Sequence, residues 1–214
     1  METIHLLALA LHVMGGNLAL ATGAFIMIAK KGNSRHRYAG RWFYYSMLCV
    51  SLTSLLLSLI IESVFLLHIG IFVFYQNHAG YRSVHNKALI HTAVDWVVLM
   101  AALLNGLFML ASLQPVLSVF GALSLLLCTG DLFIMYRLKK NLAVKPLAWL
   151  SRHIGMMMGA YIGTITAFLV VNVKDGTGSN LYYWLGPTFL FVPLMQYWIW
   201  KYTAKGRRKE AVRS

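Results

Sequence analysis

The sequence predicts an all-α, polytopic membrane protein with seven transmembrane helices, an N-terminus outside the cell and a C-terminus in the cytoplasm. Two observations predict this class. The 214 residues are 59% hydrophobic and only 12% charged, whereas an ordinary soluble domain is about 25% charged. Because a spanning helix takes roughly 20 apolar residues, the chain has room for about seven of them and for no separate water-soluble domain.

Seven apolar stretches are bounded by charges, turns or polar clusters, as expected for spans that end among lipid headgroups. They cover about residues 5–29, 41–61, 63–81, 88–111, 115–136, 149–172 and 182–202. Together they predict a single seven-helix transmembrane domain over residues 1–204. Residues 205–214 follow as a basic cytoplasmic tail.

The positions of the basic residues predict the orientation. With seven spans and the N-terminus outside, 18 of the 19 Lys and Arg residues lie on the cytoplasmic side, and only Lys174 lies outside. Glu2, Glu62 and Asp175 mark the outer ends. This is the distribution that the positive-inside tendency describes, so we assign the net charge of +13 to topology and to contact with the lipid bilayer, and expect no nucleic acid partner.

The third stretch is the weakest of the seven. Its strongly apolar part, Val64 to Tyr75, is short before Gln76, Asn77 and His78, and by length alone it is typical of a re-entrant or interfacial segment. Without it, however, the basic connection before Arg152 would lie outside the cell, against the positive-inside tendency. We therefore expect this segment to cross.

Polar and small residues recur at helical spacing within three spans, where they mark functional sites or helix contacts. The fourth span has His91, Asp95, Val98, Ala102 and Asn105; the fifth has Gly121, Ser124, Cys128 and Asp131; and the sixth has Gly155, Gly159 and Gly163. The glycine ridge would let another helix approach closely, either within one chain or in a homo-oligomer.

Two pairs of histidines lie at matching depths. At 1.5 Å rise per residue, His91 and His153 are level near the cytoplasmic face, and His12 and His68 are level near the outer face. Two such pairs are what a transmembrane b-type cytochrome needs to hold haem b by bis-imidazole ligation. In this hypothesis Arg41 and Arg152 pair with the propionates.

The same residues allow other interpretations. His91, Asp95, Asp131 and His153 could instead bind zinc, iron or manganese, since imidazole and carboxylate together suit these metals, and an open coordination position would activate water for hydrolysis. His91 and Asp95, four residues apart, could simply form a hydrogen bond within one helix. His36 could replace His91 in an inner cluster, which His78 and His85 could join.

Two short motifs resemble a known family. The turn after the first span reads His36-Arg37-Tyr38-Ala39-Gly40-Arg41, and Arg152-His153 opens the sixth span. This H-R-x-x-G-R turn and basic-His start of a late span are similar to a prokaryotic domain-of-unknown-function family of predicted multi-pass membrane proteins. The resemblance implies a bacterial inner-membrane protein and adds weight to a cytoplasmic-face site that includes His36, Arg37 and Gly40. It transfers no catalytic role.

Three hypotheses for function follow from the sequence. The first is an intramembrane haem-binding protein that transfers electrons, with a quinone or a redox protein as partner. The second is a metal-dependent membrane hydrolase that uses the cytoplasmic His/Asp cluster. The third is a small transporter or accessory subunit, in which the polar groups only hold helices together.

Overall fold

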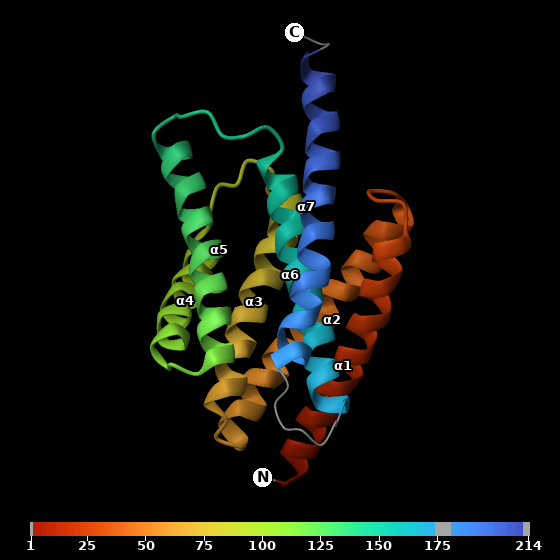
Figure 1. The fold of residues 1–214 in the computed structure, drawn as a ribbon, viewed down its shortest axis with the longest axis vertical. Helices are drawn as coiled ribbons and strands as arrows, with labels where there is room; N and C mark the ends of the chain where they lie inside the picture. Colours follow the sequence, from red (N-terminus) through yellow and green to blue (C-terminus); the bar gives the residue numbers. More distant parts are fainter. Residues whose placement is uncertain (1, 174–180, 212–214) are drawn as a thin grey trace.

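The computed structural model describes residues 2–173 and 181–211, with side chains described as far as Ala204. This part of the chain forms seven α-helices and no strand, which confirms the all-α class (Figure 1). The helices are α1 (Glu2–Ile28), α2 (Ser34–Ile60), α3 (Val64–His85), α4 (Ala93–Ala111), α5 (Pro115–Lys139), α6 (Ala148–Asn172) and α7 (Leu181–Ala211). They run along one long axis, so the connections lie at its two ends (Figure 1).

Five of these helices, α1, α2, α4, α5 and α6, are long and apolar enough to cross a membrane. The chain is therefore built as a membrane protein. Helix α3 has 22 residues, about 33 Å at 1.5 Å per residue, but it carries the polar run from Gln76 to His78 in its second half. Helix α7 contains Pro187 and Pro193 and continues past the predicted domain boundary at residue 204 to Ala211.

The starts of three helices are fixed by side-chain caps. Asn33, Ser63 and Thr92 precede α2, α3 and α4, and each side chain accepts a hydrogen bond from the backbone N–H three residues later, which satisfies a donor that the helix itself leaves unpaired. Two predicted boundaries were wrong as a result. Helix α2 begins at Ser34, which brings His36 into its first turn, and α4 begins at Ala93, which leaves His91 before the helix.

Helix α3 lies at the centre of the bundle. It packs against α2, α4, α5 and α6, while α1 pairs with α2, α4 with α5, and α7 with α6. In Figure 1 the α4–α5 pair and the α1–α2 pair therefore flank a central pair of α3 and α6. Residues from α3 thus reach side chains on both sides of the molecule.

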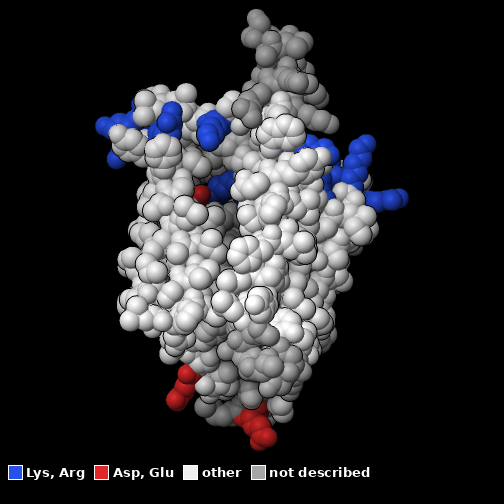
Figure 2. Space-filling model, in the orientation of Figure 1, with Lys and Arg blue, Asp and Glu red and all other residues white. Residues whose placement is uncertain are grey.

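On the face shown in Figure 2, charged residues gather towards the two ends of the bundle, with a band almost free of charged residues between them. We call the end that carries the α1–α2, α3–α4 and α5–α6 connections the basic end, and the opposite end, with Glu2 and Glu62, the acidic end. The band exposes large apolar side chains, Leu7, Met14 and Phe108 among them. Such a surface suits lipid contact.

Two of the three glycines in the predicted α6 ridge are used within the chain. A Cβ on Gly159 would lie 2.8 Å from Gln76 Nε2, and one on Gly163 would lie 3.4 Å from Val73 Cγ2. Both neighbours belong to α3, so the ridge lets α3 and α6 approach closely. Around Gly155 a Cβ would meet nothing within 4 Å.

Candidate ligand cavity and buried ion pairs

A cavity of about 680 Å³ opens among α1, α2, α3, α6 and α7 towards the basic end. Its volume lies within the roughly 300–1,000 Å³ typical of cofactor and small-molecule sites. The basic residues in the lining are three histidines and four cations: His36, His85, His153, Lys31, Arg37, Arg41 and Lys87. Among the described residues no Asp or Glu lines it, so the cavity favours an anionic group.

His153 is oriented like a ligand to a metal centre. It follows Arg152 near the start of α6, and its Nδ1 donates to the backbone carbonyl of Gly80, 2.9 Å away. Because a carbonyl only accepts, Nδ1 carries the proton and Nε2 keeps its lone pair. A backbone carbonyl on the remote nitrogen is the usual means by which proteins orient a coordinating imidazole.

His36 lines the same cavity from the first turn of α2. Its backbone N–H donates to Asn33 Oδ1 at 2.8 Å, so the cap fixes the backbone of the turn that carries His36. In the described part of the chain its buried Nδ1 has no hydrogen-bond partner.

The two lysines at the mouth are occupied by contacts within the protein. Lys31 Nζ donates to the carbonyls of Ile26 and Met27, at 2.6 and 2.7 Å, and lies 4.1 Å from the centre of the Trp198 ring. Lys31 lies between α1 and α2, and burial lowers its pKa. Lys87 Nζ lies 4.9 Å from the centre of the Trp149 ring. Through the Ile26 and Met27 carbonyls and the Trp198 ring, Lys31 connects the end of α1 to α7.

A buried ion pair lies behind the cavity, between α6 and α5. Arg152 Nε and Nη2 donate to the two carboxylate oxygens of Asp131, and Nη1 donates to Ala79 O and Ser83 Oγ. Tyr75 donates its hydroxyl hydrogen to Asp131 at 2.8 Å. The side chains of Arg152 and Asp131 are only 9% and 3% exposed, and these contacts satisfy both of them.

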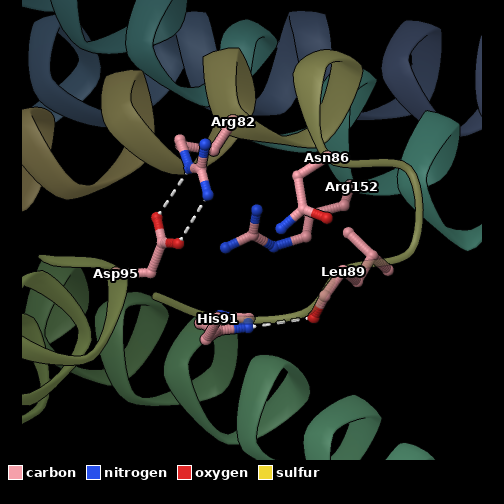
Figure 3. Close-up of a pocket in the computed structure, with 6 residues that line it drawn as sticks. All are labelled: Arg82, Asn86, Leu89, His91, Asp95 and Arg152. Atoms are coloured by element: carbon pink, nitrogen blue, oxygen red, sulfur yellow. Dashed lines mark hydrogen bonds and ion pairs between the residues drawn. The ribbon is translucent and has the colours of Figure 1, made fainter. Parts of the chain in front are cut away.

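A second ion pair joins α3 to α4. Arg82 Nε and Nη2 donate to the two oxygens of Asp95, each at 2.9 Å, and His78 Nε2 donates to Asp95 at 2.8 Å. Asp95 also accepts from the N–H and hydroxyl of Thr92 in a capping box. Figure 3 shows Arg82, Asp95, His91 and the Arg152 guanidinium around a hollow of about 10 Å³, which is about the size of one water molecule.

The predicted metal set of His91, Asp95, Asp131 and His153 does not assemble. Each carboxylate is held by an arginine, and His91 Nδ1 donates to Leu89 O. In residues 2–173 and 181–204, no group of three or more His, Cys, Asp or Glu side chains could hold a metal ion. The predicted hydrogen bond between His91 and Asp95 is also wrong, because His91 precedes α4.

The predicted inner histidine pair is divided between two sites. His153 lines the large cavity, whereas His91 lines the small hollow beside Arg152. Of the two arginines predicted to meet propionates, Arg41 lines the cavity and Arg152 does not. The alternative cluster, in which His36 replaces His91, matches the cavity, and Arg37 and Gly40 of the H-R-x-x-G-R turn also line it.

The two histidines of the predicted outer pair, His12 and His68, each have a hydrogen-bond partner on a neighbouring helix. His68 Nδ1 donates to Asn105 Oδ1 at 2.6 Å, and Asn105 Nδ2 donates back to the His68 carbonyl at 3.0 Å, so this pair joins α3 to α4. His12 Nδ1 lies 3.1 Å from Thr53 Oγ1 on α2. Each histidine therefore contacts a neighbouring helix near the acidic end.

No family model matches the chain, and comparisons with curated proteins and with solved structures found no similar protein. The resemblance carried by His36–Arg41 and Arg152-His153 therefore stays a prediction, and function has to be argued from the cavity.

Proposed function

We propose that this protein is a multi-pass bacterial inner-membrane protein that binds haem b in the large cavity and transfers electrons, with a quinone or a redox protein as its partner. His153 and His36 would hold the haem iron through their imidazoles. Bound haem b would supply a one-electron iron couple. The chain itself supplies the imidazoles, the apolar walls and the cations at the mouth.

The observation that carries this proposal is the pairing of His153 and His36 in one cavity. His153 presents an unprotonated Nε2 because Gly80 O holds its Nδ1 proton, and His36 has a buried ring nitrogen without a hydrogen-bond partner among the described residues. A buried polar atom without a partner is costly, and a ligand in the cavity would remove that cost. Among the described residues, neither histidine has a hydrogen bond or ion pair with a carboxylate that would favour its charged form.

The proposed orientation puts the N-terminus outside the cell and the basic end in the cytoplasm. Support comes from the separation of charge along the bundle, with Lys and Arg at one end and Glu2 and Glu62 at the other. By the positive-inside tendency, the end with Lys and Arg faces the cytoplasm and the end with the two glutamates faces the exterior. In this proposal all seven helices cross the membrane, and the cavity opens on the cytoplasmic side.

The test is an absorption spectrum of the full-length protein purified in detergent, oxidised and then reduced with dithionite, after growth with a haem precursor. We expect a Soret band that shifts on reduction. His153→Ala and His36→Ala should each lose most of that band, because each removes a proposed axial ligand.

His91→Ala is the matched control. His91 lies at the same end of the molecule but lines the small hollow instead of the cavity, so this variant should keep the spectrum of the parent protein. A colourless parent protein that also takes up no added haem would refute the proposal. Loss of the band in His91→Ala, but not in His36→Ala, would replace His36 by His91 as the second ligand.

A further inference from the structure

The cavity changes in character along its depth. Gly23, Phe43 and Tyr161 line its inner end, where the Phe43 and Tyr161 rings meet edge to face with their centres 6.1 Å apart. Gly23 lies five residues before the end of α1 at Ile28, about 7.5 Å along the helix, and Lys31 follows in the connection beyond that end. A ligand that fills the cavity therefore has an apolar floor beneath it and a ring of cations around its outer end.

Among the described residues, two of the four cations at the mouth have no partner within the protein. Lys31 is bonded to carbonyls and covers Trp198, and Lys87 lies over Trp149. The ion pairs found in the described residues use the carboxylates of Asp95 and Asp131, and none of them includes Arg37 or Arg41. These two arginines lie four residues apart, on one face of α2.

We infer that the cavity selects an amphipathic acid, and that Arg37 and Arg41 bind its carboxylates at the mouth while its apolar part lies against the floor. This rests on the proposed function, since haem b carries two carboxylates on one edge of an apolar ring. Guanidinium groups bind carboxylates through paired, charge-assisted hydrogen bonds. A neutral ligand of the same shape would leave both arginines without such a partner.

The experiment compares two probes that share one porphyrin ring and differ at its two carboxyl groups, which are free acids in one probe and neutral methyl esters in the other. The full-length apoprotein in detergent is titrated with iron protoporphyrin IX and, separately, with its dimethyl ester, and the Soret difference spectrum is followed. We expect the free acid to bind about tenfold more tightly, which corresponds to about 1.4 kcal/mol, because the ester cannot form the charge-assisted pairs with the two guanidinium groups. That preference should shrink as salt is added.

The Arg37→Gln/Arg41→Gln double variant should bind both probes with the affinity that the parent protein has for the ester. Arg35→Gln is the matched control, because Arg35 is exposed on the same turn of α2 but does not line the cavity. Helical circular dichroism confirms that each variant is folded.

A failure of the acid selectivity can be distinguished from a failure of haem binding itself. Equal affinity of the parent protein for acid and ester, unchanged in the double variant, would overturn the acid selectivity and leave haem binding intact. A parent protein that gives no histidine-dependent Soret change with either probe would overturn both. A tenfold preference that survives in the double variant would assign the carboxylates to other residues and overturn the role of Arg37 and Arg41.

Discussion

At the scale of single residues, the buried charges act as connectors between helices. Arg152 reaches Asp131 on α5 and two oxygens on α3, so one side chain links three helices directly before His153. The sequence identified Arg152 and Asp131 as buried polar residues but assigned them to different sites. Helical periodicity tells which face of a helix is buried, and it does not tell which carboxylate a long, flexible side chain will reach.

Asp131→Ala should therefore destabilise the protein strongly. It leaves the Arg152 guanidinium, in a side chain only 9% exposed, without its counter-ion, and breaking a buried pair from one side costs about 3–5 kcal/mol. The measurement is unfolding in mixed micelles with rising SDS, followed by circular dichroism. A loss below about 1 kcal/mol would contradict the structural role of the pair.

The control for that variant removes both charges together. Arg152→Met with Asp131→Leu replaces the pair by apolar side chains of similar size, and such replacements are often neutral or stabilising. We expect the double variant to recover most of the lost stability. If the double variant is as unstable as Asp131→Ala, the polar bonds to Ala79, Ser83 and Tyr75 carry more of the stability than the ion pair does.

At the scale of helices, burial was predicted well and boundaries less well. The α5 stripe of Gly121, Ser124, Cys128 and Asp131 is entirely buried, because a 3.6-residue period determines the buried face whatever packs against it. The start of α4 was placed too early. The signal that could have corrected it was present, since Thr92-x-x-Asp95 has the spacing of a capping box, and the structure forms that box.

The crossing of α4 and α5 depends on a glycine. A Cβ on Gly121 would lie 2.8 Å from the backbone nitrogen of Leu110 and 2.9 Å from the carbonyl oxygen of Gly106, and backbone atoms cannot move aside as a side chain can. Gly121→Ala should lower the free energy of unfolding by about 1–3 kcal/mol, the usual cost of overpacking. Unfolding in mixed micelles measures this.

Gly130 provides the matched control on the same helix, since a Cβ there would meet nothing within 4 Å. Gly130→Ala should be neutral or stabilise the protein by up to about 1 kcal/mol, because alanine is the better helix former. If both variants lose a similar free energy of unfolding, the close approach of α5 to α4 at Gly121 does not explain the loss.

At the scale of the whole molecule, the cavity is the feature that the sequence could predict least. Its lining comes from five helices and includes residues as far apart as Gly23 and Tyr202. Matching histidines by depth found His153 but paired it with His91, because the predicted fourth span included His91, whereas His91 precedes α4 and lines the small hollow. The family motif drew attention to His36, Arg37, Gly40 and Arg41 together, and all four line the cavity.

The course of the chain across the membrane gives the last prediction. With Cys49 and Cys128 replaced by alanine, single cysteines are introduced in place of Glu62, Lys87 and Lys140 and labelled in intact spheroplasts with a membrane-impermeant maleimide. With seven spans and the N-terminus outside, the cysteine at position 62 should react at once, and those at positions 87 and 140 only after the membrane is permeabilised.

The cysteine at position 87 decides whether α3 crosses. If α3 does not cross, positions 62 and 87 lie on one side, and every later connection changes sides, so the cysteines at positions 62, 87 and 140 would all react from outside. That result would put the basic connection between α5 and α6 outside the cell, against the positive-inside tendency. The cavity is lined by α1 and α2, which precede α3 in the chain, and by α6 and α7, which follow it. The proposed cytoplasmic opening of the cavity therefore requires that α3 crosses the membrane.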